Sequence, residues 1–396
     1  MSRMAAGFAG VVLLALLAVA APDSPIAKKG PPLGIWIRDL AFSPDGKLLA
    51  AVTGEPKQRG QVILWDVATR RPRWVHLEAN GVPAAAFAPD GRALAIAVYD
   101  KTAKLLDVQT GAVQRTLTGH AKEIRGVAFA PDGKTLATAS WDRTVRLWNL
   151  PAGTVLRTLE GHGQRVYEVR FSPDGRTLAA VGDQAVSLWD VGTGQRRSLK
   201  GEHGSVVRGV GYSPDGRFLA TACWDGYTRI WDAATDTLRL AINTNSSERA
   251  VFSPDGRLLA VCGLASFVQL FPVALESGGR DAERVAGLVA RLDDDDYKVR
   301  VAATEHLRKE GLRAEPALRR AVKESKSAEL RIRARRILGE LLSQPAVMLG
   351  GHSGEVDALA FAPSGRILAS GAKDGTIKLW DLATNREVAS FGVSGQ

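Results

Sequence analysis

Histidine, a hydroxyl-bearing residue and aspartate recur in the same order three times along this chain, each time followed by tryptophan. The three sets are His120, Thr138, Asp142 and Trp148; His203, Thr221, Asp225 and Trp231; and His352, Ser370, Asp374 and Trp380. Histidine, hydroxyl and aspartate are the residue types of a nucleophilic catalytic triad. An active site occurs once, however, whereas this arrangement occurs three times. The repetition favours a structural role, in which buried polar groups pair with one another and losing a partner costs about 1–3 kcal/mol.

A nine-residue phrase shows which elements position these sets. It reads Phe-Ser-Pro-Asp-Gly-Lys-Leu-Leu-Ala at 42–50, and six variants begin at Phe87, Phe129, Phe171, Tyr212, Phe252 and Phe361. Proline presets the start of a turn and Asp-Gly accepts left-handed conformations, so each copy predicts a strand, a tight turn and a second strand. The first six copies are 40–45 residues apart, the length of one four-stranded propeller blade, and the last gap is 109 residues. Seven copies therefore predict seven blades and one inserted element.

Two further motifs recur in register with this phrase. Trp-Asp or Trp-Asn pairs begin at Trp65, Trp148, Trp189, Trp231 and Trp380, and Gly-His pairs begin at Gly119, Gly161 and Gly351. Together the motifs resemble the WD-repeat β-propeller family over residues 33–275 and 345–394. The resemblance implies an all-β, seven-bladed β-propeller of four-stranded antiparallel blades, in which each of the three sets forms a buried hydrogen-bonded group. Blade 4 keeps His162, Asp183 and Trp189 but has Ala180 in place of the hydroxyl.

The same resemblance implies a partner-binding face, because propellers of this family commonly bind partners on the face that carries the histidine and aspartate loops. The motif positions on that face are Trp36, Arg38, Tyr99, Arg125, Trp141, Arg165, Tyr167, Arg208, Trp224 and Lys373. Tryptophan, tyrosine and arginine are enriched at interface hot spots. We therefore expect a binding surface here; the alternative is that Trp141 and Trp224 merely cover the mouth of the central channel. The positive charge favours an acidic protein or peptide as the partner.

Between residues 276 and 344 the composition changes to one rich in Arg, Glu, Ala and Leu. Apolar residues at helical spacing predict four helices, near 281–292, 297–309, 313–323 and 327–342. The stretches 296–300 and 315–318 resemble HEAT-type helical repeats. About two repeats fall below the three usually needed for independent stability, so the segment should pack on the propeller or on a partner. Residues 346–352 look like the fourth strand of blade 6 and the start of blade 7, which places the helices within blade 6.

The first 21 residues have the pattern of a secretory signal peptide. Arg3 supplies a positive start, residues 7–20 are apolar, and small residues at 18–21 fit a cleavage site. The apolar run is short for a membrane span of about 20 residues. We therefore predict cleavage and export to the periplasm, the cell envelope or the medium, with no transmembrane span left afterwards. The alternative is an uncleaved anchor.

Charge and cysteine content limit the remaining possibilities. Lys and Arg number 52 against 42 Asp and Glu, and the pI is about 9.7. In an exported protein this excess favours anionic surfaces or acidic proteins as partners, and we expect no nucleic acid. Cys223 and Cys262 are expected to be buried thiols, with a disulfide as the alternative. The sequence contains no CxxC or HExxH motif, so we expect no metal and no cofactor.

These observations predict an exported, non-enzymatic scaffold that binds a protein or peptide partner on the propeller face. The alternative is a propeller enzyme, or a binder of an anionic ligand, that uses the central channel. That alternative requires unique acidic residues or a metal cluster converging on the channel, and the sequence shows none at a diagnostic spacing.

Overall fold

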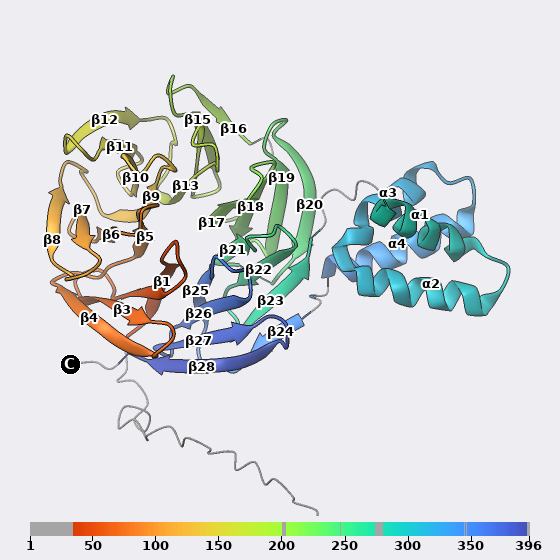
Figure 1. Ribbon diagram of the computed structural model, residues 1–396. Coiled ribbons are helices and arrows are strands. Elements are labelled where there is room, and N and C mark those ends of the chain that lie inside the picture. Colours follow the sequence, from red (N-terminus) through yellow and green to blue (C-terminus); the bar gives the residue numbers. More distant parts are fainter. Residues whose placement is uncertain are drawn as a thin grey trace, which may run out of the picture.

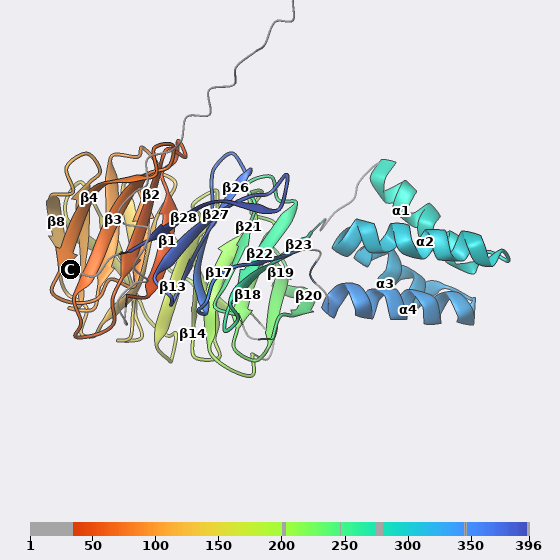
Figure 2. The ribbon, with the colours of Figure 1, turned by 90° about the horizontal axis from the view of Figure 1, so that it is seen from below.

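A ring of seven four-stranded antiparallel sheets forms the body of the protein (Figure 1). The computed structural model describes residues 35–199, 203–245, 247–273, 280–343, 345 and 347–393. Four helices lie beside the edge of the ring, as both views show (Figures 1 and 2). The predicted fold class, a seven-bladed propeller with a helical insertion, is confirmed.

The strands follow one another in sequence order, four to a blade, from the channel outwards. Blades 1 to 3 consist of β1 (Ile37–Phe42), β2 (Leu48–Thr53), β3 (Gly60–Asp66) and β4 (Arg71–Glu78); β5 (Ala84–Phe87), β6 (Ala93–Val98), β7 (Thr102–Asp107) and β8 (Val113–Leu117); and β9 (Ile124–Phe129), β10 (Thr135–Ser140), β11 (Val145–Asn149) and β12 (Thr154–Leu159). Blades 4 and 5 consist of β13 (Val166–Phe171), β14 (Thr177–Gly182), β15 (Val186–Asp190) and β16 (Arg196–Ser198); and β17 (Val207–Tyr212), β18 (Phe218–Cys223), β19 (Tyr227–Asp232) and β20 (Thr237–Asn243). Blades 6 and 7 consist of β21 (Arg249–Phe252), β22 (Leu258–Cys262), β23 (Phe267–Pro272) and β24 (Val347–Gly350); and β25 (Val356–Phe361), β26 (Ile367–Ala372), β27 (Thr376–Asp381) and β28 (Arg386–Gly392).

The repeated phrase builds the same turn in every blade. In blade 1 the Ser43 hydroxyl donates to the Asp45 carboxylate at 2.6 Å and accepts the backbone N–H of Leu48 at 2.9 Å. Gly46 has φ +70°, and the equivalent glycines of the other blades have φ between +65° and +73°. Only glycine adopts this region without strain, which explains why the phrase always ends its turn with glycine.

The turn glycines also link neighbouring blades around the whole ring. A Cβ placed on each glycine would lie 3.3–3.8 Å from Cδ of the turn proline in the preceding blade. The pairs are Gly91 with Pro44, Gly133 with Pro89, Gly175 with Pro131, Gly216 with Pro173, Gly256 with Pro214, Gly365 with Pro254 and Gly46 with Pro363. The last pair joins blades 1 and 7, so the series of contacts closes on itself.

Blade 7 carries its own outer strand, β28. Blades 1 and 7 meet through β1 and β25, and one apolar cluster that includes Ile37 and Ile377 fills the space between them. On the outer side Trp65 stacks on Phe391 with ring centroids 5.1 Å apart. Side-chain packing, rather than a shared strand, therefore closes the ring.

Both cysteines are buried and free. Cys223 belongs to the apolar cluster between blades 4 and 5, and Cys262 to the cluster between blades 6 and 7. The two side chains thus leave their sheets on opposite sides. Burial raises the pKa of both thiols, which favours the uncharged form.

The insertion contains α1 (Arg280–Ala290), α2 (Tyr297–Glu310), α3 (Glu315–Glu324) and α4 (Ala328–Ser343), with 3-10 turns at Arg291–Asp293 and Gly311–Ala314. Its helices connect β23 to β24, so the predicted place within blade 6 is confirmed. Asp296 caps α2 by accepting the backbone N–H of Lys298 at 2.8 Å.

The helices pack on the propeller rather than standing apart from it. One apolar cluster joins Ile242 of β20 and Val273 after β23 to Ile337 and Leu341 of α4. A Cβ on Gly311 would lie 2.6 Å from Cγ of Pro272, so the turn before α3 approaches the end of β23 too closely for a side chain. This shared core supplies the burial that two helical repeats lack on their own.

The N-terminal prediction concerns a part of the chain that is not described. The predicted signal peptide at 1–21 lies outside the described residues. Among the described residues, no helix is both long enough and apolar enough to span a membrane.

Candidate partner-binding site

A β-bulge at the start of the inner strand sets the geometry of the channel mouth in five blades. The register between the first and second strands skips one residue there, and the skipped residues are Arg38, Arg125, Tyr167, Arg208 and Asp357. A bulge inserts one unpaired residue and re-aims its side chain. These five residues, with Glu248 at the same place in blade 6, are called the mouth ring below.

Arg125 is the centre of an aromatic cage within the mouth ring. Its guanidinium carbon lies 5.5 Å from the ring centroid of Tyr99 and 5.9 Å from those of Trp141 and Tyr167. It also hydrogen-bonds the Tyr99 hydroxyl. No carboxylate among the described residues forms an ion pair with Arg125. Burial lowers the pKa of its guanidinium to about 10, because the charged form has lost water without gaining an anion.

Three other predicted cations are already neutralised inside the protein. Arg38 pairs with Asp357 at 3.1 Å and with Glu55. Arg208 pairs with Glu248 at 3.0 Å. Lys373 pairs with Glu355 and also lies 4.8 Å from the ring centroid of Trp36. These side chains contribute first to the fold of the mouth, although the sequence suggested only a binding role.

The remaining predicted side chains lie around the cage. Arg165 is exposed, lies 5.5 Å from the ring of Trp141, and has no carboxylate partner in the described part of the chain. Trp141 is partly buried, and its indole N–H has no hydrogen-bond partner among the described residues. Trp224 is 41% exposed, and its indole N–H donates to Glu248 at 2.8 Å. Contacts join seven of the ten predicted residues, from Tyr99 to Trp224, into a belt at the mouth, with Arg125 and Arg165 as its two cations that lack a carboxylate in the described part of the chain. Trp36, Arg38 and Lys373 form a second group beside it.

Glu248 escaped the sequence analysis, because blade 6 lacks the Gly-His and Trp motifs that located the equivalent residues in other blades. Glu248 is buried, with 8% of the residue exposed, and its carboxylate accepts hydrogen bonds from Arg208 and Trp224. Although burial raises the pKa of Glu248, these two donors outweigh it and hold the pKa below its usual value. Its position four residues before Phe252 was the signal that could have revealed it.

A second set of charges lies further along the inner strands, one residue after the mouth ring for Asp39, Glu168 and Arg249 and three residues after it for Arg170, and these residues were not predicted from the sequence. This channel cluster comprises Asp39, Glu168, Arg170 and Arg249, which line a cavity of about 220 Å³ on the channel axis. Arg249 of blade 6 reaches Glu168 of blade 4 at 2.7 Å and Asp39 of blade 1 at 3.5 Å. Arg170 adds a contact of 2.6 Å to Glu168. Arg249 therefore ties together three blades that are not neighbours.

The pKa directions in the channel cluster follow from this pairing. Burial raises the pKa of Asp39, and the positive charges of Arg249 and Arg170 only partly oppose it. For Arg249, Glu168 and Asp39 outweigh burial and raise the pKa of the guanidinium above its usual value. The position three residues before the phrase aromatic is small or apolar in the other four blades, so the charged residues there were visible in the sequence.

The polar set of blade 3 is hydrogen-bonded throughout. His120 contacts Asp142 through Nδ1 and Thr138 through Nε2, both at 2.7 Å, and the Trp148 indole donates to Thr138 at 2.9 Å. Burial alone would raise the pKa of Asp142, but hydrogen bonds from His120 and Thr144 outweigh it and lower the pKa. Every member of the set is held by another member, as a structural set requires.

Blades 5 and 7 keep the histidine–hydroxyl–tryptophan part of the set but differ at the aspartate. In blade 7 His352 contacts Ser370 at 2.7 Å and lies 3.5 Å from Asp374. In blade 5 Asp225 pairs instead with Arg229 at 2.8 Å. The cause is local, because a threonine two residues after the aspartate bonds that carboxylate in blades 3 and 7, whereas blade 5 has Tyr227 there. Burial and then Arg229 lower the pKa of His203 to about 4.

Blade 4 shows what the missing hydroxyl costs. Ala180 occupies its place, and neither ring nitrogen of His162 has a hydrogen-bond partner in the described part of the chain. Asp183 accepts a hydrogen bond from Tyr167 of the mouth ring at 3.0 Å. Burial lowers the pKa of His162, so the imidazole stays neutral inside the blade.

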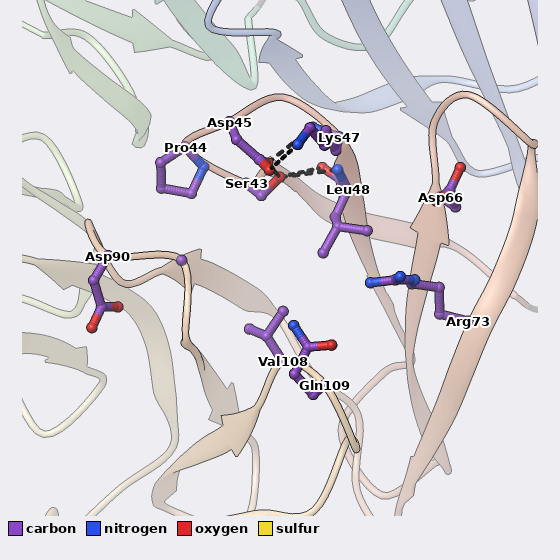
Figure 3. A pocket seen from close by; sticks show the side chains of 11 residues that line it. Ser43, Pro44, Asp45, Lys47, Leu48, Asp66, Arg73, Asp90, Val108 and Gln109 are labelled. Atoms are coloured by element: carbon purple, nitrogen blue, oxygen red, sulfur yellow. Dashed lines mark hydrogen bonds and ion pairs between the residues drawn. The ribbon is translucent and has the colours of Figure 1, made fainter.

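A further hollow, of about 260 Å³, lies between blades 1 and 2 on the face that carries the turns (Figure 3). Its carboxylates serve their own turns, because Asp45 bonds Ser43, Asp66 bonds Thr69 and Asp90 bonds the N–H of Arg92. Asp66 and Asp90 stand on opposite sides of the hollow and do not converge (Figure 3). The mouth belt therefore remains the better candidate site.

A closed ring, polar sets that repeat as structural units and a belt of aromatic and cationic side chains define a β-propeller of the interaction-scaffold class. A family model described as the first β-propeller of IFT122 matches residues 82–284, about half of the chain, and one described as WD domain, G-beta repeat matches residues 30–66 and 343–381. The chain belongs to the WD40-repeat β-propeller family, as its motifs suggested.

Short segments of this chain are similar to curated ribosome-related proteins. Ribosome biogenesis protein ERB1 of Ajellomyces capsulatus is 45% identical over 51 residues, which are 13% of this chain and 6% of that protein. Small ribosomal subunit protein RACK1 of Medicago sativa is 51% identical over 43 residues, 11% of this chain and 13% of that protein. Ribosome biogenesis protein BOP1 homolog of Caenorhabditis elegans is 40% identical over 52 residues, 13% and 8% respectively. The chain spans only a small part of the length of these relatives, about one blade.

The comparison contradicts one prediction from the sequence. The names of these relatives connect them with the ribosome and with ribosome biogenesis. The prediction that this chain is exported to the periplasm, the cell envelope or the medium is therefore wrong. The N-terminal apolar pattern was the sole basis for that prediction.

Proposed function

We propose that this protein is a non-enzymatic scaffold that binds an acidic segment of a protein partner at the channel mouth. The observation that carries the proposal is Arg125, a partly buried cation caged by three aromatic rings and without a carboxylate partner in the described residues. An incoming carboxylate would supply the missing anion. Exposed Arg165 and the half-open Trp224 extend the surface on which the rest of the partner can lie.

The energetics favour recognition at Arg125 over a purely structural role. A cation near an aromatic ring gains about 0.5–2 kcal/mol, which holds the guanidinium in place but does not replace its lost hydration. A charge-assisted hydrogen bond to a carboxylate is among the stronger contacts in proteins. Because the cage already fixes the side chain, little rotamer entropy remains to be lost when the partner binds.

The alternative, an anionic ligand or substrate deep in the channel, gains less support. The cations nearest the channel cavity, Arg249 and Arg170, are paired with Asp39 and Glu168. An anion entering this cavity would have to displace a buried carboxylate. Capacity for an added negative charge is therefore greater at the mouth than below it.

Binding of a fluorescein-labelled hexaglutamate peptide at low ionic strength tests the proposal. Fluorescence anisotropy should show saturable binding that Arg125→Met together with Arg165→Met weakens by at least about ten-fold, since one good anchor contributes about 2 kcal/mol. Arg257→Met is the matched control, because Arg257 is exposed on the turn face of blade 6 with 72% of its side chain accessible.

Two results would overturn the proposal. One is hexaglutamate binding that is equally strong in the double variant and in the wild type. The other is equal binding of a hexalysine peptide, which would show that charge complementarity at the mouth does not select the partner.

A further inference from the structure

A groove of about 360 Å³ opens between α1 and α2 of the helical insertion. Leu288, Val299 and Ala303 supply an apolar floor, and Arg291 and His306 stand on its rim. Neither the blade motifs nor the proposed function involves this groove. Its helices belong to the connection between β23 and β24, away from the inner strands that form the channel mouth.

The groove lies on a flank of α1 that no described residue covers. Val285 and Val289 of α1 are buried in the core shared with α3 and α4. Arg284 and Arg291 lie about 100° around the helix from Val285, because successive residues turn by that angle. The rim of the groove is therefore exposed to solvent while the neighbouring face of the same helix is packed.

A glycine in the middle of α1 opens this flank further. Gly287 lies one helical turn from Arg284 and Arg291, on the same flank, and a Cβ placed on it would meet nothing within 4 Å. Glycine destabilises the interior of a helix relative to alanine. A glycine in the middle of α1 therefore suggests that a side chain at this position would be unfavourable for some other reason. Packing among the described residues gives no such reason at Gly287. Close approach of another chain would give one.

Repeat architecture indicates what that chain is. Helical repeats bury their apolar faces by stacking, and a terminal repeat normally carries a polar outer face. Here α1 and α2 stack on α3 and α4, yet the groove on their free flank has an apolar floor at which Val299 stays partly exposed. An amphipathic helix laid into this groove would continue the stack and cover the floor.

The charges around the groove indicate which helix fits. Arg291 is exposed and has no ion-pair partner among the described residues, and His306 is exposed beside it. Arg284 pairs with Glu310 at 2.6 Å, which leaves the rim with net positive charge. A second copy of this insertion would present the stretch 313–336, with nine Lys or Arg against three Glu, and would be repelled.

We propose that the α1–α2 groove binds an amphipathic helix of a partner protein, with apolar side chains on one face and acidic side chains flanking them. The apolar face covers Leu288 and Val299 and passes close to Gly287. The acidic flank meets Arg291. This makes the insertion a second docking surface, independent of the channel mouth.

A labelled peptide of about 15 residues tests the proposal, with leucines at i, i+3, i+4 and i+7 and glutamates at the flanking positions. Fluorescence anisotropy should detect binding that Gly287→Leu weakens by at least about ten-fold, because the new side chain fills the path of the helix. Gly339→Leu in α4 is the matched control, since a Cβ at Gly339 also meets nothing within 4 Å. Both changes raise helix propensity, so neither should unfold the insertion.

Further variants separate this groove from the channel mouth. Arg291→Glu should weaken binding of the acidic peptide. It should strengthen binding of a version of the peptide in which lysines replace the glutamates. Arg125→Met should leave peptide binding unchanged, and Gly287→Leu should leave hexaglutamate binding unchanged. Equal binding to the Gly287→Leu and wild-type proteins, or to a scrambled peptide, would overturn the proposal. So would concentration-dependent self-association that Gly287→Leu abolishes, because the groove would then join copies of this chain.

Discussion

The mouth ring and the channel cluster occupy neighbouring positions on the inner strands, yet their charged side chains are paired differently. In the channel cluster each charged side chain has an opposite partner, and Arg249 joins three blades through Asp39 and Glu168. In the mouth ring Arg208 has Glu248 and Arg38 has Asp357, but Arg125 has aromatic rings alone. Arginine therefore stabilises the fold through ion pairs in the channel cluster, whereas Arg125 in the mouth ring has no counter-ion among the described residues.

The difference teaches that pairing, rather than burial, separates structural from recognition arginines here. Removing one partner of a buried ion pair strands the other charge, which is costly. Removing an arginine that has no counter-ion strands nothing. Three arginine-to-methionine changes, which keep much of the side-chain volume, should therefore give a graded series set by the number of carboxylates left behind.

Arg249→Met should have the largest effect, because it leaves Asp39 without a counter-ion and leaves Glu168 paired with Arg170 alone. We expect the free energy of unfolding to fall by about 3–5 kcal/mol in denaturant titrations at neutral pH. Arg257→Met on the exposed turn of the same blade should change it by less than about 0.5 kcal/mol. If Arg249→Met lowered the free energy of unfolding by less than about 1 kcal/mol, the ion pairs of the channel cluster would not stabilise the fold.

The pH dependence of Arg249→Met sharpens this expectation. Burial already raises the pKa of Asp39, and removing Arg249 takes away an opposing charge and raises it further. A carboxyl whose folded pKa exceeds its unfolded value gains stability as the pH falls through the folded pKa. The deficit of Arg249→Met relative to wild type should therefore shrink as the pH is lowered from neutral.

Arg208→Met should have an intermediate effect on stability. It removes the counter-ion of one carboxylate, Glu248, which keeps its hydrogen bond from Trp224. A loss of about 1–3 kcal/mol is expected in the same titration. The folded pKa of Glu248 lies below its usual value, so its stabilisation is present above about pH 4 and is lost as the pH falls through the folded pKa. Wild type and Arg208→Met should therefore converge in acid. A difference that stays constant with pH would contradict the assigned pair.

Ala180→Ser tests whether pairing also matters for a neutral buried group, the imidazole of His162. The serine hydroxyl would occupy the place of Thr138, Thr221 and Ser370 and offer His162 the partner it lacks. We expect a gain of about 1 kcal/mol in stability. Ala179→Ser is the control, because Ala179 faces the apolar cluster between blades 4 and 5 and its hydroxyl should destabilise. Equal effects of the two changes would contradict the assignment.

Arg125→Met should have the smallest effect on stability, within about 0.5 kcal/mol of wild type. Its binding effect should be the largest of the three arginine changes, because the others remove charges that are already paired. Thermal unfolding and hexaglutamate anisotropy on the same samples check both parts. A stability loss as large as that of Arg208→Met would move Arg125 into the structural group.

The sequence predicted the ring and the helical insertion because their signals are local. A turn phrase with Pro and Gly fixes its own geometry, and its period counts the blades. The aspartate of blade 5 shows where local signals end, because Tyr227 in place of threonine redirects Asp225 to Arg229. The pairing of Arg208 with Glu248, and the reach of Arg249 across the channel, depend on which side chains meet after the ring closes. No sequence spacing encodes those distances.

The self-contained blade 7 has a consequence for the order in which the molecule can assemble during synthesis. Because no strand is shared between the two ends, blades 1 to 5 can each form from a single contiguous stretch as it leaves the ribosome. Blade 6 is different, since β24 follows β23 only after four helices. The helices are thus made before the blade they interrupt is complete, and their core on blades 5 and 6 can form while β23 still has an open edge.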